Sequence, residues 1–301
     1  MPHSLDHPSS RPLLGEVRSL FQKRRIFFSL RTHIAFVCGG NKKKDLRPRF
    51  IQFVGNSKSK LAIFRAEDAL VDLFSHRDPD FINLGKLEKL IANVFDSIVI
   101  FPESPGSYAE LGYFAHDRQI RKRTLIVNSD TYQSDSFLTL GPIAAVDQDS
   151  IFRSTILLRK DSNKPRFDLV INRLMRITSK RQHREPFRYK PYKAMSPKDR
   201  FLVIAEIVNI FGAIDLLDLE ICIKTAFGTA HRSELRELVS ILCAAQLVAR
   251  DRHDPDYFVP TQRSKRFLEY EHFDIESLQA KIAQHYKKYD PDRFSILGRI
   301  Q

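Results

Sequence analysis

Residues 101–110, with the sequence Phe-Pro-Glu-Ser-Pro-Gly-Ser-Tyr-Ala-Glu, carry the side chains best suited to chemistry. They follow an apolar run that is typical of a buried strand, and they lead into a predicted helix. Gly106 permits a tight turn, Ser104 and Ser107 offer hydroxyls, and the N–H groups of a helix start attract phosphate or ribose oxygens. Glu110 lies one turn inside the helix, where a carboxylate can stabilise or attack an electron-poor anomeric carbon. We therefore predict that Glu110 is catalytic and that the two serines and the glycine bind substrate.

The same residues permit a second interpretation. The spacing Ser107-x-x-Glu110 fits a capping box, in which two side chains only satisfy N–H groups at the start of a helix. Small residues at Gly112 and Ala115 would let the helix pack closely on a sheet and hold the carboxylate near a ligand, which favours the catalytic interpretation. The spacing alone leaves both interpretations open.

Two further strands are predicted to end beside this segment. The first, over 33–38, runs into a pair of glycines, which let the backbone approach a ligand closely. The second, over 61–64, is soon followed by two acidic residues, whose carboxylates can bind ribose hydroxyls or orient Glu110. Because parallel strands place their carboxyl ends at one edge of a sheet, five more residues are predicted to bind substrate: Cys38, Gly39, Gly40, Glu67 and Asp68.

Strands alternate with helices through the first half of the chain. Besides the two strands above, strands are predicted over 97–101 and 123–127, and helices over 49–57, 83–95 and 108–118. This alternation predicts an α/β fold with a Rossmann-like parallel sheet and a site at the carboxyl ends of its strands. Glu88, inside the second of these helices, is expected to be exposed.

A basic segment follows at 177–193, where six lysines and arginines stand against one acid, Glu185. Prolines interrupt the segment and aromatic residues interleave it, so we predict a linker over 176–195. It is either a solvated connector or a direct contact to the backbone of a nucleic acid. In the second case the contacts come from Lys180, Arg181, Arg184, Arg188 and Lys190.

Residues 196–301 show the pattern of a helical module with a hairpin. Helices are predicted near 201–211, 215–227, 233–245 and 268–286, and two short strands flank a turn at 251–256. Three helices followed by a hairpin form the plan of a winged helix-turn-helix domain, and a protein-docking module is the alternative. The predicted contacts to a nucleic-acid backbone come from Arg232, Arg236, Arg250 and Arg252.

The composition restricts the class of protein. The chain has 301 residues and a formal net charge of +13, which favours a polyanionic partner such as nucleic acid. An apolar run of about 18 residues, as a membrane helix needs, is absent, and the first residues lack the apolar centre of a signal peptide. The three cysteines form no metal-binding or disulfide pattern. We expect a cytoplasmic protein with no membrane partner, no cofactor and no metal.

The segment 101–112 resembles the active-site turn of nucleoside 2-deoxyribosyltransferase-like proteins. The resemblance is closer still to effector proteins of bacterial retrons, which join such a domain to a C-terminal DNA-binding domain. It covers roughly residues 33–300, and matching stretches fall in the corresponding order at 36–40, 66–68, 87–88, 96 and 136–142. The resulting division is an N-terminal arm at 1–30, a deoxyribosyltransferase-like domain at 31–175, the basic linker at 176–195 and a winged-helix nucleic-acid-binding domain at 196–301. Ala66 departs from the family pattern, in which a proline is expected.

In that family the glutamate that matches Glu110 is the catalytic carboxylate. The resemblance implies a toxin of anti-phage defence, an N-glycosidase that cleaves the base–ribose bond of a nucleotide, with NAD as the expected substrate. The implied partners are a reverse transcriptase and its multicopy single-stranded DNA, which restrain the effector, and further copies of the chain in a homo-oligomer. The alternative is a nucleic-acid-binding regulator whose α/β domain senses a nucleotide without cleaving it.

Overall fold

The computed structural model describes residues 4–23, 25–28, 33–59, 61–75, 83–130, 136–179, 186–261 and 267–299. The chain divides into two compact units. The α/β unit comprises residues 31–67 and 80–183, and the C-terminal unit comprises residues 1–30, 68–79 and 184–301. Within the described ranges, no helix is both long and apolar enough to cross a bilayer.

A five-stranded parallel sheet forms the centre of the α/β unit and confirms the predicted α/β class. Its strands are β2 (His33–Gly39), β3 (Leu61–Phe64), β4 (Ser97–Phe101), β5 (Thr124–Ser129) and β6 (Ile156–Leu158). They are hydrogen-bonded in the order β3-β2-β4-β5-β6, a doubly wound arrangement that binds ligands where the strand order reverses. At that reversal, Gly39 at the end of β2 is the register partner of Phe101 at the end of β4.

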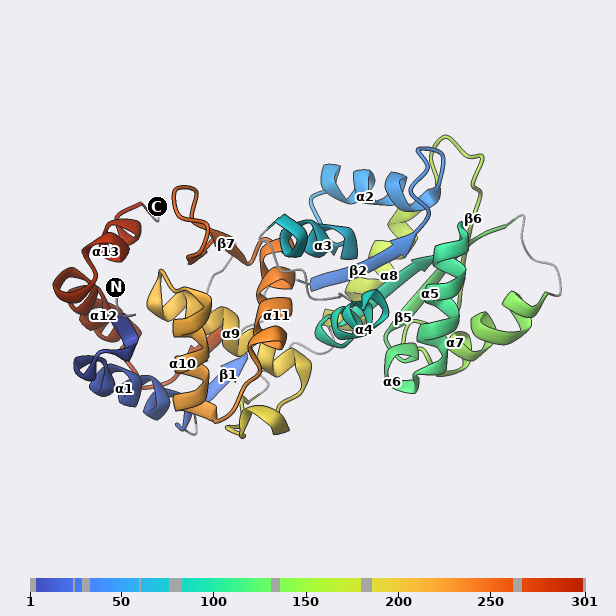
Figure 1. Cartoon of the computed structure of the whole chain (residues 1–301). Coiled ribbons are helices and arrows are strands. Elements are labelled where there is room, and N and C mark those ends of the chain that lie inside the picture. The colour runs from blue at the N-terminus through green and yellow to red at the C-terminus, as the bar shows by residue number, and fades with distance from the viewer. Residues whose placement is uncertain are drawn as a thin grey trace. The chain divides into compact units, whose positions relative to one another are not determined.

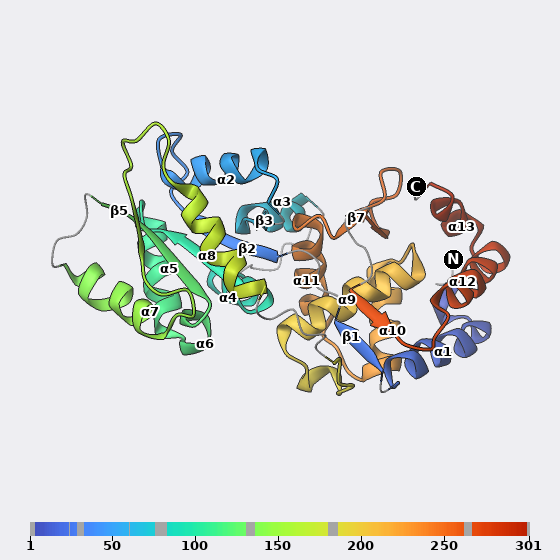
Figure 2. The ribbon, with the colours of Figure 1, turned by 180° about the vertical axis from the view of Figure 1, so that it is seen from behind.

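Helices cover both faces of this sheet. They are α2 (Leu46–Asn56), α4 (Leu84–Val94), α5 (Pro105–His116), α6 (Arg118–Arg121), α7 (Ala144–Asp149), which follows the π-helical turn η3 (Thr139–Ile143), and α8 (Phe167–Ser179). On one face, Phe50 of α2 and Leu174 of α8 join the core of the unit. On the other, the ring of Phe114 in α5 lies 6.1 Å from that of Phe36 in β2. Figures 1 and 2 show α5 and α8 on opposite faces.

Two helices begin earlier than the pattern predicts. Helix α5 starts at Pro105 instead of residue 108, because Ser104 is its N-cap and proline is well suited to the first helical position. Helix α3 (Ala66–Ser75) starts two residues after β3, so Glu67 and Asp68 lie in a helical turn and not in a loop. The division of the chain falls inside α3, with Glu67 in the α/β unit and Asp68 in the C-terminal unit.

The C-terminal unit is mainly helical. Its helices are α1 (Arg11–Phe21), α9 (Pro197–Phe211), α10 (Leu216–Phe227), α11 (Arg232–Ala244), α12 (Ile275–Tyr289) and α13 (Pro291–Leu297), with the short turns η1 (Ser4–Asp6), η2 (Pro8–Ser10) and η4 (Tyr192–Ala194). As predicted, α9, α10 and α11 are followed by an antiparallel pair, β7 (Val248–Arg250) and β8 (Phe258–Pro260). The N-terminal residues expected as an arm supply α1, which packs against α10 and α12 (Figure 1).

The predicted last helix over 268–286 is wrong at its start. Residues Leu268–Tyr270 form strand β9, which pairs antiparallel with β1 (Ile26–Phe28), and α12 begins only at Ile275. The partner strand is about 240 residues away in the chain, so no local pattern reports it. Of the expected linker, Phe187 and Tyr192 are buried within this unit.

Candidate active site

Two serines close the turn that begins α5. The Ser104 hydroxyl accepts a hydrogen bond from the Ser107 N–H at 3.2 Å. In return, the Ser107 hydroxyl accepts hydrogen bonds from the N–H groups of Ser104 and Glu103, both at 2.9 Å. This reciprocal pair is the capping box of α5, so the alternative pairing of Ser107 with Glu110 is wrong. The Glu110 carboxylate therefore has no capping role.

Glu110 carries a carboxylate oxygen that the protein does not satisfy. Its Oε2 atom is buried and has no hydrogen-bond partner among the described residues. Burial raises the pKa of Glu110, while the Arg47 guanidinium and a hydrogen bond from the Cys38 thiol act in the opposite direction. Buried acceptors are normally paired, so this oxygen is available to a ligand or an ordered water. Ala115 is buried as expected, whereas Gly112 is exposed and has open space around it.

Arg47 of α2 joins several of the predicted residues. Its Nη2 donates to both carboxylate oxygens of Glu67, at 2.7 and 2.8 Å. Its Nη1 donates to the Gly39 carbonyl at 3.2 Å and to the Asn41 side chain at 2.6 Å. Although burial acts to raise the pKa of Glu67, hydrogen bonds from Arg47 and its charge lower it. The Nε of Arg47 is also buried and has no partner in the described part of the chain, so a second polar atom of the site is unsatisfied.

Sequence reasoning did not single out Arg47. It stands in the basic run Lys-Lys-Lys-Asp-Leu-Arg-Pro-Arg at 42–49, and such runs are usually solvated. In the structure its side chain is only 4% exposed. The one usable signal was its position in the first turn of the helix that follows β2 and the glycine pair.

The glycines at the end of β2 are required by the protein itself. A Cβ atom on Gly39, whose φ is +156°, would lie 2.9 Å from the Cβ atoms of Arg47 and Phe101. A Cβ atom on Gly40 would lie 2.2 Å from a carboxylate oxygen of Asp45. Larger residues would therefore displace Arg47 or Asp45. Direct contact of these glycines with a ligand stays a prediction.

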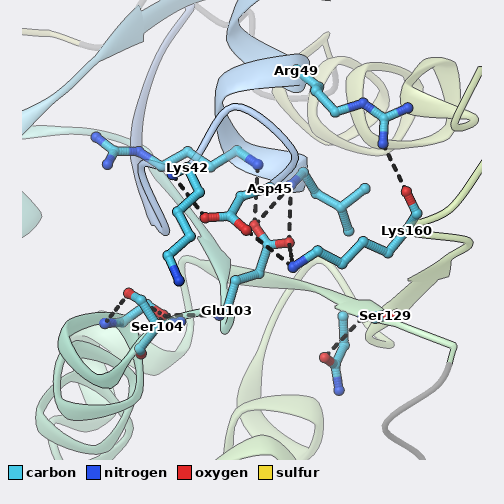
Figure 3. Close-up of polar contacts among 11 residues, drawn as sticks. Lys42, Asp45, Arg49, Glu103, Ser104, Ser129 and Lys160 are labelled. Atoms are coloured by element: carbon cyan, nitrogen blue, oxygen red, sulfur yellow. Dashed lines mark hydrogen bonds and ion pairs between the residues drawn. The ribbon is translucent and has the colours of Figure 1, made fainter. Parts of the chain in front are cut away.

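Glu103 fixes the start of α2. Its carboxylate accepts hydrogen bonds from the N–H groups of Leu46, at 2.9 Å, and Arg47, at 3.3 Å. Lys160 Nζ lies 3.3 Å from Glu103 and 3.0 Å from Asp45, and Figure 3 shows these three side chains pointing toward one another. A carboxylate at a helix N-terminus is favoured by the helix dipole. Glu103 thus occupies the N–H groups that could otherwise bind phosphate, and it anchors the helix that carries Arg47.

Glu88 of α4 is half-buried, so the expectation that it is exposed is wrong. Burial, and then the negative charges of Glu110 and Glu67, raise the pKa of Glu88 to about 7. Burial and the charges of Glu110 and Glu88 likewise raise the pKa of the Cys38 thiol. We call these five groups, each of which interacts with at least two of the others, the carboxylate cluster: Cys38, Arg47, Glu67, Glu88 and Glu110.

Two other predicted substrate residues lie outside this cluster. Asp68 belongs to the C-terminal unit, and none of the charges that act on Glu110 is that of Asp68. Gly106 is exposed at the start of α5, where a Cβ atom would approach only the Ser104 hydroxyl, at 4.0 Å. Over the residues that the structure describes, no group of three or more His, Cys, Asp or Glu side chains is arranged to hold a metal ion.

The predicted nucleic-acid contacts fall into different environments. Three of them are outside the described residues: Lys180, Arg181 and Arg184. Three are exposed: Arg188, Lys190 and Arg252. The others lie along a hollow of about 440 Å³ between α11 and the β7–β8 hairpin: Arg232, Arg236 and Arg250. Four aspartates share that hollow, so its charge is mixed.

Two of these arginines are engaged by acids of their own unit. Arg250 donates from Nε to Asp72 at 2.9 Å, and its side chain is only 16% exposed. Asp72 also accepts a hydrogen bond from the Ser240 hydroxyl at 2.8 Å. Arg232 Nε donates to Glu220 at 2.7 Å. Arg250 therefore holds α3 to α11 and β7, whereas Arg252 is exposed in the turn of the hairpin.

Comparison with known proteins finds relatives of the chain among retron proteins. The chain is 25% identical over 289 residues to "Retron Ec73 putative ribosyltransferase/DNA-binding protein" of Escherichia coli, a match that covers 88% of each chain. It is 33% identical over 132 residues to "Retron Ec86 putative ribosyltransferase/DNA-binding protein" of the same organism, covering 43% of this chain and 41% of that relative. The family model described as STM3845 retron effector protein matches residues 43–250, which is more than half of the chain. The protein belongs to this family of retron effectors.

Proposed function

We propose that the α/β unit is an N-glycosidase that cleaves the base–ribose bond of a nucleotide, with Glu110 as its catalytic carboxylate. The observation that carries this proposal is the buried Oε2 of Glu110, which has no partner among the described residues, at the point where the strand order reverses. The Arg47 guanidinium acts on the same carboxylate and has an unsatisfied Nε. The names of both relatives include ribosyltransferase, a class that acts at the same anomeric carbon.

The reaction follows from the charge that develops at the sugar. When the C1′–N bond breaks, its electron pair leaves with the base and C1′ becomes cationic. The Glu110 carboxylate either bonds to C1′ or stabilises the cation by its charge, and Arg47 favours its ionised form. Water then adds its oxygen to C1′ and loses a proton. NAD is the proposed first substrate, because its nicotinamide nitrogen is already positive and departs as a neutral base.

We further propose that the C-terminal unit is a winged-helix domain that binds nucleic acid. The order α9, α10, α11 and the β7–β8 hairpin supports it, as do the net charge of +13 and the word DNA-binding in the relatives' names. In this proposal the protein is the toxin of an anti-phage retron. It is restrained by a reverse transcriptase and multicopy single-stranded DNA, and it acts as a homo-oligomer.

The test is base release by the full chain and by Glu110→Gln, each with NAD and with deoxynucleotides. Glutamine keeps the size of the side chain and removes its charge, so we expect release to fall by about 10³-fold or more. Glu16→Gln is the matched control, because Glu16 forms an exposed ion pair with Lys281 in the C-terminal unit. Undiminished release by Glu110→Gln contradicts the role of this residue. Nucleotide binding without any release by the unchanged protein would indicate a sensor.

A further inference from the structure

Helix α11 presents a polar face to the hollow that it forms with the β7–β8 hairpin. Arg232, Arg236 and Ser240 line this hollow and are spaced four residues apart, so they lie on one face of the helix. Leu235 and Leu242, at other positions around the helix, are fully buried in the core. The hollow is therefore lined by hydrogen-bond donors from α11, and Arg250 of β7 adds another.

The carboxylate of Asp72, from α3, binds two of these donors. The Ser240 hydroxyl donates to its Oδ2 at 2.8 Å, and Arg250 donates from Nε to Oδ1 at 2.9 Å and from Nη2 to Oδ2 at 3.1 Å. Two parallel bonds are also how an arginine binds a phosphate, and serine hydroxyls commonly donate to phosphate oxygens. All three residues belong to the C-terminal unit. Asp72 thus occupies a position that suits a phosphate.

The hairpin holds the Arg250 guanidinium independently of Asp72. Its Nη1 donates to the Pro255 carbonyl at 2.9 Å. Its central carbon lies 4.8 Å from the centre of the Phe258 ring, which favours the cation. The guanidinium should therefore keep its orientation when Asp72 leaves. An incoming anion would meet a donor that is already positioned, which lowers the cost of binding.

The contact of α3 with the hollow is narrow. Leu73 is buried and lines the hollow together with Asp72, whereas Val71 and Phe74 on the same helix are exposed. The helix has only ten residues, and an isolated helix of that length is barely stable in water. Its second half is therefore a segment that a competing ligand can displace.

The other aspartates that line the hollow are placed differently. Asp215 forms an ion pair with the buried Arg293 at 3.1 Å. Asp254 and Asp256 are exposed in the turn of the hairpin. Departure of Asp72 would thus free the Ser240 hydroxyl and two N–H groups of Arg250, and would remove one negative charge from beside them.

We infer that a backbone phosphate of a nucleic acid binds to Ser240 and Arg250 by displacing Asp72. This inference rests on the proposed binding of nucleic acid by the C-terminal unit, and it names a phosphate site and the group that covers it. A phosphodiester has the single negative charge and the two oxygens that the same donors now receive from the carboxylate. The second half of α3 leaves the hollow with Asp72, so this segment lowers the affinity of the protein for nucleic acid.

The experiment compares two neutralised aspartates of the same hollow. Binding of single-stranded and of duplex oligonucleotides is measured at several salt concentrations with the full chain, Asp72→Asn and Asp256→Asn. Asparagine keeps the size of the side chain and removes its charge. For Asp72→Asn we expect the affinity to rise about tenfold and the log–log salt slope for single strands to steepen by about 0.7. For Asp256→Asn we expect a rise of less than about twofold, because its exposed charge is screened.

Arg250 provides a second arm of the experiment. Arg250→Ala should change the affinity by less than about twofold while Asp72 is present, and should cancel the gain when it is combined with Asp72→Asn. Ser240→Ala makes the same test with a smaller change and should remove part of that gain. Thermal unfolding identifies the temperature at which all variants are folded, and binding is compared there.

Displacement of α3 also has a readout of its own. Amide hydrogen exchange over residues 69–75 should become faster when the oligonucleotide binds, because the released segment is too short to stay helical. Equal gains for Asp72→Asn and Asp256→Asn, a gain that survives the loss of Arg250, or exchange that does not become faster would each overturn the displacement. These results would leave the proposed binding of nucleic acid intact. Absence of binding by every variant would overturn both.

Discussion

The Ser107 hydroxyl accepts a hydrogen bond from the Ser104 N–H at 2.9 Å, and this contact determines what Glu110 can do. The spacing Ser107-x-x-Glu110 also fitted a capping box made by these two residues. Because it pairs with Ser104, the N-terminus of α5 is satisfied without a glutamate. Glu110 thus keeps a buried oxygen that the described residues leave unpaired. Substitution of Ser107, which caps the helix, and substitution of Glu110, the proposed catalytic carboxylate, should therefore have different effects on stability and on turnover.

Ser107→Ala should affect stability more than turnover. The substitution removes the hydroxyl that accepts from two backbone N–H groups, so we expect the free energy of unfolding to fall by about 1 kcal/mol. Turnover per folded molecule should not change. Denaturant titration and base-release kinetics measure the two quantities. Ser196→Ala, which removes the N-cap of α9, is the matched control. A loss of turnover without a loss of stability would show instead that Ser107 touches the substrate.

Arg47→Met should shift the pH dependence of base release. Methionine keeps the apolar stem and removes the guanidinium, so the pKa of Glu110 should rise further and the acid limb should move to higher pH. The lost bonds to Glu67 and to the Gly39 carbonyl should lower the free energy of unfolding by about 2–3 kcal/mol. Arg49→Met is the control, because Arg49 donates to the Lys160 carbonyl, outside the carboxylate cluster. If both variants keep the original acid limb, Arg47 does not act on Glu110.

Glu88→Gln should stabilise the fold at alkaline pH. Folding raises the pKa of Glu88 to about 7, so the folded protein holds more protons than the unfolded chain between about pH 4.3 and 7. The contribution of Glu88 to stability is therefore full at low pH and is lost as the pH rises through 7. Allowing for solvent screening, we expect Glu88→Gln to gain of the order of 1–2 kcal/mol at pH 8 and about 0 at pH 4. Unfolding titrations at both pH values measure this, and a loss of stability at pH 8 would contradict it.

Arg252→Ala should weaken nucleic-acid binding, whereas Arg250→Ala should mainly lower the stability of the fold. Arg252 is exposed, so its loss should weaken binding of single-stranded DNA and reduce the salt dependence of binding by about 0.7 in log–log slope. Arg250→Ala removes the ion pair with Asp72 and should lower the free energy of unfolding by about 1–3 kcal/mol. Binding at several salt concentrations and thermal unfolding distinguish the two. Binding that does not respond to salt would contradict a contact with the nucleic-acid backbone.

Much of the α/β unit could be predicted because most of its strands are recognisable from their own short runs of apolar residues. The run Ser97–Phe101 is apolar throughout and buried throughout, and the spacing to Glu110 is set within one turn and one helix. Arg47 and Glu88 could not be predicted in the same way. Arg47 is buried at the start of α2, and Glu88 is half-buried on α4, although the sequence around each resembles a solvated surface. The pairing of β1 with β9 could not be predicted either, because these strands lie near opposite ends of the chain and no local pattern links them.

The most direct measurement is nicotinamide release from NAD by the full chain, with Glu110→Gln and Glu16→Gln measured in parallel under conditions where all three are folded. We expect release by the unchanged protein and by Glu16→Gln, and a loss of about 10³-fold or more for Glu110→Gln. The deoxynucleotides are tested in the same series, so a different substrate preference is detected directly. Equal release by Glu110→Gln and the unchanged protein would contradict the assignment of Glu110 as the catalytic carboxylate.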